Sequence, residues 1–198
     1  MSRNIPVAVA ISLALSACGS SKPSEDEIRS TLSERVDVKG CATSALFNNI
    51  PIKQERIGYN QSIIDAIIAA NLIKKSGDTY ELTDLGKSAY DADYKGFCYT
   101  DKYVIKDIAV VKQEDKNALS GTSLSDAWYV SFTISPSSVS EWVKTPQIIE
   151  NAKKDSMTNI SDTQNYTVLL AKKAGDEKLF IADQRFSFHP GISFHMGF

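Results

Sequence analysis

Apolar residues follow two different spacings along this chain. Between residues 60 and 73 they recur every three or four positions, which predicts an amphipathic helix. The residues on its apolar face are Ile63, Ile64, Ile67, Ile68 and Leu72. Beyond residue 99 apolar and polar residues alternate instead, most regularly over 127–135, and this pattern predicts strands with one buried face.

Shorter patterns mark further helices. Ser24 and Glu27 have the spacing of a capping box, and Ile28, Leu32 and Val36 follow as a narrow apolar stripe, so a helix is expected from residue 24 until Lys39-Gly40. A second capping box is expected at Ser138 to Glu141, with the helix that follows broken near Pro146.

The C-terminal half predicts mainly antiparallel strands. We expect strands over 103–112, 127–135 and 166–172, and a fourth over 178–188 that forms a hairpin with the third around Gly175. Residues 159–165 are expected to be a loop, and residues 192–196 to return as a last strand after a turn at Pro190-Gly191. The fold class is therefore α+β: a helical domain over 24–98, then an antiparallel sheet with one packed helix over 99–198.

Part of the helical region has a recognisable order of small and apolar residues. Asn71-Leu72-Ile73, Gly77, Tyr80 to Thr83 and Gly86 follow the predicted helix, and this run, over residues 63–90, resembles a winged-helix unit. Such a resemblance implies a helix, a hairpin and a further helix. It does not imply DNA binding here, because residues 51–92 hold five basic and six acidic residues, the wrong balance for a phosphate-binding face.

The N-terminus has the layout of an export signal. Arg3 precedes an apolar run over residues 5–15, which is long enough for a signal peptide but too short to cross a bilayer. The run ends in Leu15-Ser16-Ala17-Cys18, which matches a lipobox and so resembles the bacterial lipoproteins. An ordinary secretory signal with an incidental Cys18 is the alternative.

The lipoprotein resemblance implies that residues 1–17 are removed and that Cys18 is acylated. Gly19 follows the cysteine where Asp would favour retention in the inner membrane, so the resemblance implies the outer membrane, facing the periplasm. Residues 18–23 form a tether. At about 3.3 Å per residue it reaches less than roughly 20 Å, so the folded body must lie close to the membrane.

The expected export of the chain bears on whether its two remaining cysteines form a disulfide. Cys41 and Cys98 are the only others, and in an oxidising compartment a disulfide between them is the default. Two free buried thiols are the alternative. A metal site is disfavoured because neither cysteine has a Cys or His neighbour at ligand spacing.

Other candidate sites give weaker signals. His189 and His195 flank Pro190-Gly191, but in a hairpin their rings would not converge, so no metal is expected. Trp128, Tyr129 and Trp142 either line a ligand cleft or belong to the core, and the core is favoured. No catalytic or cofactor motif is present in the sequence, and the formal net charge of −2 gives no case for a nucleic-acid partner.

These observations favour a non-enzymatic, lipid-anchored accessory protein of the cell envelope that binds another envelope protein. An inhibitor or immunity lipoprotein acting on a periplasmic toxin or hydrolase is the second hypothesis. A small-molecule or cell-wall enzyme using the aromatic residues is the third.

Overall fold

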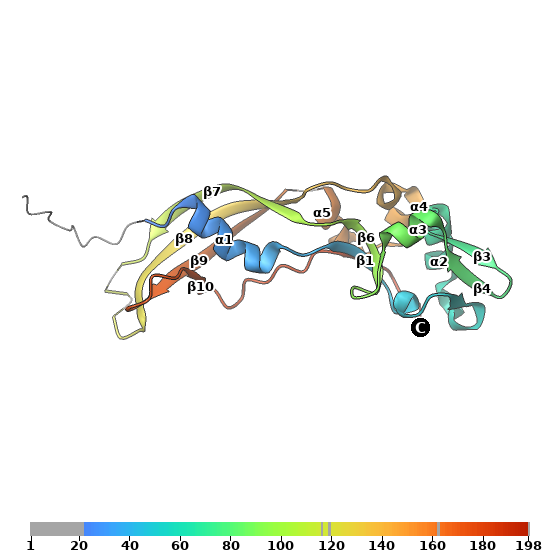
Figure 1. Ribbon diagram of the computed structural model, residues 1–198, viewed down its shortest axis with the longest axis horizontal. Helices are drawn as coiled ribbons and strands as arrows, with labels where there is room; N and C mark the ends of the chain where they lie inside the picture. Colours follow the sequence, from blue (N-terminus) through green and yellow to red (C-terminus); the bar gives the residue numbers. More distant parts are fainter. Residues whose placement is uncertain (1–21, 116, 119, 162, 198) are drawn as a thin grey trace, which may run out of the picture.

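The computed structural model describes residues 22–115, 117–118, 120–161 and 163–197. Residues 1–17, Cys18 and the tether up to residue 21 lie outside the described residues. Helices and mainly antiparallel sheets share the described chain, so the expected α+β class is confirmed. The molecule is elongated, with most of the long strands toward one end and most of the helices toward the other (Figure 1).

The first core lies between a long antiparallel sheet and one helix. The sheet has the order β10-β9-β8-β7, with bounds β7 Tyr103–Gln113, β8 Leu124–Pro136, β9 Gln164–Lys173 and β10 Phe180–Ile181. Helix α1, Glu25–Val36, packs on one face of this sheet and buries Ile28, Leu32 and Val36 against residues that include Trp128 and Val130. The capping box of Ser24 and Glu27 is confirmed.

The second core is built from two smaller sheets and several short helices. One sheet has the order β11-β1-β6-β5 and the other the order β2-β4-β3. The strands are β1 Gly40–Thr43, β2 Ile52–Lys53, β3 Ile73–Ser76, β4 Thr79–Leu82, β5 Tyr90–Asp91, β6 Gly96–Thr100 and β11 Ile192–Ser193. The α-helices are α2 Gln61–Ala69, α3 Asp84–Ala89, α4 Pro146–Asn151 and α5 Lys154–Ser161. Four 3₁₀ helices accompany them among the described residues: η1 Ala45–Asn48, η2 Gln54–Arg56, η3 Gly58–Asn60 and η4 Glu141–Lys144.

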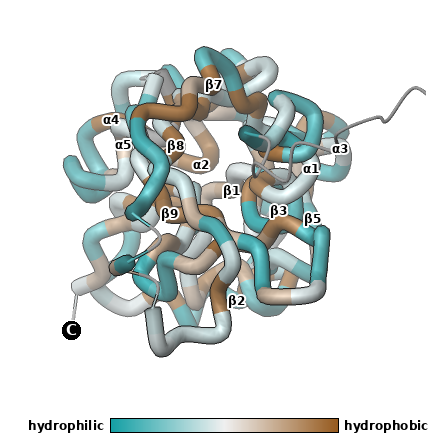
Figure 2. Tube along the Cα trace, turned by 90° about the vertical axis from the view of Figure 1, so that its left-hand side faces the viewer, coloured by the Kyte–Doolittle hydropathy of each residue, from teal (hydrophilic) through white to brown (hydrophobic). Residues whose placement is uncertain are grey.

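The two cores follow one another along the long axis, and their elements overlap in the view along it (Figure 2). Neither core keeps to one side of the expected boundary between residues 98 and 99. The first takes α1 from the N-terminal range, and the second takes Trp142, Ile148 and Phe194 from the C-terminal range. The division of the chain into domains over 24–98 and 99–198 stays a prediction from the sequence.

Helix α2 ends earlier than its apolar pattern suggests. Asn71 adopts a positive φ of 57°, and the amides of Asn71 and Leu72 donate to the carbonyls of Ile68 and Ile67. This is a Schellman motif, in which a left-handed residue stops the helix and satisfies its last carbonyls. Leu72 and Ile73 remain buried, and Ile73 begins β3 and the hairpin with β4. Helix, hairpin and α3 follow in the expected order, but the winged-helix assignment itself is not confirmed.

The expected strands over 103–112, 127–135 and 166–172 are confirmed as β7, β8 and β9, and the break before Pro146 is confirmed by the boundary between η4 and α4. Two other expectations are wrong: residues 154–161 form α5 instead of leaving a loop from 159, and the expected strand over 178–188 shrinks to β10. The expected last strand is present as β11, over 192–193 only, and it pairs parallel with Ala42 and Thr43 of β1.

The second expected capping box is also wrong. Ser140 caps η4 through its backbone, with no hydrogen bond from its side chain to the helix. The side chain of Glu141 pairs instead with Lys144, at 2.6 Å between Oε1 and Nζ. Because η4 is a single 3₁₀ turn that ends before Pro146, it lacks the extended first turn that a capping box stabilises.

Candidate functional site at the junction of the two cores

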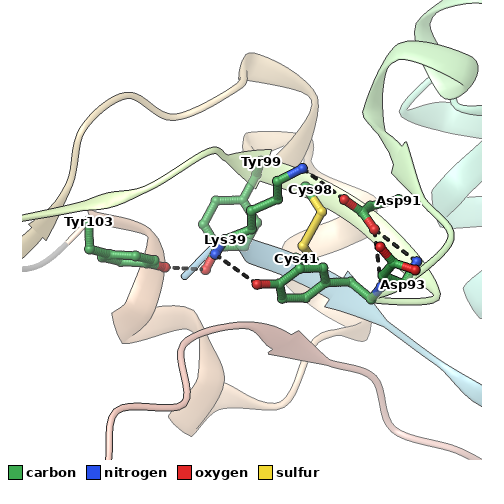
Figure 3. Close-up of a disulfide and its surroundings, with 8 residues drawn as sticks. Lys39, Cys41, Asp91, Asp93, Cys98, Tyr99 and Tyr103 are labelled. Atoms are coloured by element: carbon green, nitrogen blue, oxygen red, sulfur yellow. Dashed lines mark hydrogen bonds and ion pairs between the residues drawn. A yellow bond between two sulfur atoms is a disulfide. The ribbon is translucent and has the colours of Figure 1, made fainter. Parts of the chain in front are cut away.

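The cores are joined where α1 leads into β1 and where β6 continues into β7 (Figure 1). Cys41 on β1 lies directly opposite Cys98 on β6. Their sulfur atoms are 2.11 Å apart, so the expected pairing of these two cysteines is confirmed. The disulfide therefore joins the strand that follows α1 to the strand that precedes the long sheet (Figure 3).

An ion pair fixes the turn beside the disulfide. The Nζ of Lys39 lies 2.8 Å from Oδ2 of Asp91, and the other carboxylate oxygen of Asp91 accepts the backbone amides of Asp93 and Tyr94. These hydrogen bonds to Lys39 and to the turn lower the pKa of Asp91, and the same ion pair raises the pKa of Lys39. The hydroxyl of Tyr94 accepts the Lys39 amide at 3.3 Å.

Two buried tyrosines connect the cores directly. Tyr99 belongs to the second core and Tyr103 to the first, and their hydroxyl oxygens are 2.8 Å apart (Figure 3). Burial raises the pKa of both hydroxyls. A Cβ at Gly40 would lie 2.5 Å from the Tyr103 hydroxyl and 2.7 Å from the Tyr99 ring, so this pair requires glycine at position 40.

A cavity of about 170 Å³ lies next to Cys98 of the disulfide, between α3, β6 and residues 138–142. Its buried wall includes Tyr99, Thr100 and Trp142, and its exposed rim includes Asp101, Ser138 and Ser140. Trp142 is 6% exposed. Its indole Nε1 is buried and has no hydrogen-bond partner.

The structure separates the other residues singled out from the sequence. Trp128 and Trp142 are buried in different cores, so they do not line a shared cleft and the core interpretation of both is confirmed. Tyr129 lies beneath the ammonium group of Lys112, at 5.9 Å from its ring centre. His189 and His195 are both exposed, and no group of metal-ligating side chains occurs among the described residues.

The tyrosine pair and the ion pair were not found from the sequence. Tyr99 and Tyr103 lie on either side of the expected domain boundary, where alternation gives no indication that two hydroxyls converge. Lys39 and Asp91 lie on segments that only the disulfide suggests are neighbours. A pair of tyrosines four positions apart, directly after a cysteine, was the signal available.

At this junction the disulfide cross-links β1 to β6, the hydroxyls of Tyr99 and Tyr103 connect the two cores, and a small polar cavity lies beside them. None of the helices in the described ranges has the length and apolarity needed to cross a bilayer. Comparison with family models, with curated proteins and with solved structures finds no match for this chain.

Proposed function

We propose that the protein is a lipid-anchored accessory protein of the bacterial cell envelope, and that it binds another envelope protein. The lipobox Leu15 to Cys18 carries this proposal. A thiol is the side chain best suited to accept a lipid near neutral pH, and several acyl chains on one residue make anchoring effectively permanent. The lipoprotein resemblance implies that the lipid anchor lies in the outer membrane and that the folded body faces the periplasm.

The start of the folded body is consistent with a short tether. Pro23 is buried and Ser24 caps α1, so the folded body includes the residue five positions after Cys18. Over that length an extended chain spans less than roughly 20 Å. Helix α1 lies against the long sheet, so an acylated Cys18 would hold this sheet close to the lipid surface.

The opposite end of the molecule carries α2, α3 and the β3–β4 hairpin (Figure 1). Several large apolar side chains are exposed on the elements of the second core: Tyr59 at 85%, Ile68 at 37%, Leu85 at 40% and Ile149 at 48%. The buried centre of an interface is more apolar than the rest of a protein surface, and tyrosine is enriched among the residues that contribute most of the binding energy. This end is therefore the part of the body that we propose faces a partner.

The anchoring half of the proposal is tested by replacing the acylated residue. Cys18→Ser should abolish incorporation of a fatty-acid probe and should leave the chain uncut and out of the outer-membrane fraction. Ser20→Ala keeps the lipobox and serves as the matched control. Gly19→Asp should move the lipidated protein toward the inner membrane in a host that uses that sorting rule. Normal processing, fractionation and probe incorporation in Cys18→Ser would refute the anchor.

The binding half is tested by placing a photo-crosslinking amino acid at single positions in living cells. Crosslinkers at Tyr59 and Ile149 should capture the same envelope protein. The control position is Val111, which is 64% exposed on the long sheet and so offers apolar exposure away from the proposed contact. Failure to capture a protein at either tested position, or equal capture at Val111, would count against a partner at this end.

A further inference from the structure

The long sheet has two faces, and α1 covers one of them. Side chains alternate between the two faces along each strand. Trp128 on β8 and Leu170 on β9 belong to the first core, on the side of α1. Their neighbours Ala127, Tyr129 and Leu169 therefore point to the opposite face, which we call the outer face.

Apolar residues on the outer face are contiguous across β8, β9 and β10. Tyr129 lies opposite Leu169, and Ala127 lies opposite Ala171, which pairs in turn with Phe180. The two alanines are buried, whereas the three larger side chains are only half-buried. We call Tyr129, Leu169 and Phe180 the outer patch. Large apolar side chains that stay accessible together are typical of a surface that contacts a partner or a membrane.

Two lysines extend over the aromatic rings of the outer patch. The Nζ of Lys112 lies 5.9 Å from the centre of the Tyr129 ring, and the Nζ of Lys173 lies 5.7 Å from the centre of the Phe180 ring. The Glu114 carboxylate lies 3.6 Å from the Lys112 ammonium group, so these two charges offset each other and Lys173 gives the group a net positive charge. A lysine can cover apolar surface with its stem while its ammonium group stays in a polar phase.

The tether ends beside the outer patch. Lys172 precedes Lys173 on β9, and its Nζ lies 3.5 Å from Oε1 of Glu27 in the first turn of α1. The start of α1 and the turn between β9 and β10 lie toward the same end of the molecule (Figure 1). From Cys18 to Ser24 an extended chain spans less than roughly 20 Å. An acylated Cys18 would therefore keep this end of the sheet within reach of the lipid headgroups.

We propose that the outer patch lies against the lipid bilayer at the level of the headgroups. Tyrosine is enriched at that level because its ring is apolar and its hydroxyl is polar, and the ammonium groups of Lys112 and Lys173 contact lipid phosphates there. The proposal rests on the proposed acylation of Cys18. Three half-buried side chains bury little apolar area, and membrane binding scales with that area, so the patch orients the body while the acyl chains anchor it.

The test places a photo-crosslinking amino acid at single positions of the acylated full chain in vesicles of phosphatidylethanolamine and phosphatidylglycerol. The tested positions are Tyr129 and Leu169. Asn165 is a control on the same strand and face, four positions away from Leu169, and Ser30 is an exposed control on α1 that is nearer to Cys18 in the sequence. Mass spectrometry measures how often each position captures a phospholipid.

Tyr129 and Leu169 should capture phospholipid several times more often than either control. Two charge reversals test the part played by the lysines, with Leu169 as the reporter. Lys112→Glu combined with Lys173→Glu changes two exposed residues and should reduce capture several-fold, because acidic groups would then face the lipid phosphates. Lys106→Glu combined with Lys153→Glu makes the same change in charge at exposed positions elsewhere and should leave capture unchanged.

The mass of the N-terminal peptide shows separately whether Cys18 is acylated. Equal lipid capture at Leu169 and Ser30 by an acylated chain would overturn the docking face and leave the proposed anchor intact. Capture of a second copy of the chain at Leu169 in place of lipid, or equal effects of the two charge reversals, would overturn it too. A chain without acyl groups would refute the anchor and, with it, the membrane contact that depends on it.

Discussion

At the scale of single residues, the Cys41–Cys98 disulfide closes a loop with a sequence separation of 57 residues. In the chain-entropy model a loop of that length stabilises the folded state by roughly 4 kcal/mol. The variant Cys41→Ala with Cys98→Ala should therefore lower the free energy of unfolding in urea by a few kcal/mol. A reductant should destabilise the parent protein to a similar extent and should leave this variant unchanged. If reductant does not change the free energy of unfolding of the parent protein, and both cysteines react with a thiol-labelling reagent, the disulfide is not formed in solution.

The buried tyrosine pair predicts a pH dependence. Burial raises the pKa of Tyr99 and Tyr103 above the usual value of about 10, so the unfolded chain loses these protons at lower pH than the folded protein. Their contribution to stability is complete below about pH 10 and is lost as the pH rises beyond it. The free energy of unfolding should fall steeply above that pH.

Two variants separate this effect from other alkaline titrations. Tyr99→Phe removes one of the two groups and should make the alkaline decline shallower. Tyr59→Phe alters a side chain that is 85% exposed and should leave the slope unchanged. Lys39, whose pKa is also raised by its ion pair, adds to the decline equally in all three proteins. Equal slopes in the parent and in Tyr99→Phe would show that the tyrosine pair does not control the effect.

At the scale of elements, the parts that the sequence predicts well are those in which one face is buried. Strand β8 follows its alternation because Trp128, Val130, Phe132 and Ile134 all point into the first core. The apolar stripe over residues 63–72 predicts helix α2 equally well up to Asn71, where a single residue in the left-handed conformation ends the helix. That stop signal was available in the sequence, since Asn is one of the few residues that adopt this conformation readily.

Other elements depend on contacts that periodicity does not encode. Helix α5 has mainly polar residues, and Ile160 is its fully buried apolar residue among those with described side chains. It lies against β8 and β11, so its place is set by distant segments. The parallel pairing of β11 with β1 joins the two ends of the described chain. At the site, the number of cysteines and the expected compartment were enough to predict the disulfide. The cavity could not be predicted, because α3, β6 and residues 138–142 form it together and their relative positions are not encoded in a local pattern.

The start of α1 gives a prediction at this scale. The hydroxyl of Ser24 accepts the amide of Glu27 at 3.2 Å, and the Glu27 carboxylate accepts the Ser24 amide at 2.8 Å. Ser24→Ala should lower the free energy of unfolding by about 1 kcal/mol, the usual cost of losing such a cap. Ser30→Ala changes an exposed residue in the same helix and should be neutral or slightly stabilising. Equal effects of the two substitutions would mean that the cap does not stabilise α1.

At the scale of the whole molecule, each core needs both halves of the chain. The first core is closed by α1 from the N-terminal range together with strands beyond residue 102, and the second needs α4 and Phe194 as well as α2. The hydroxyl pair of Tyr99 and Tyr103 and the disulfide lie where the chain passes from one core to the other. This interleaving couples the cores more closely than a flexible linker would.

We therefore expect one cooperative unfolding transition rather than two. Trp128 and Trp142 report on the first and second cores respectively, so each single-tryptophan variant, Trp142→Phe or Trp128→Phe, leaves a fluorescent reporter in one core. Small single domains unfold in coincident transitions when followed by different probes, and both reporters should show the same urea midpoint once the stability cost of each variant is allowed for. Circular dichroism of the parent protein senses both cores and should show a single transition. Its m-value, the dependence of the free energy of unfolding on urea concentration, should be that expected if the whole folded body becomes exposed in one step. Two resolved steps, in which the Trp142 and Trp128 signals change at different urea concentrations, would instead mean that the two cores unfold independently.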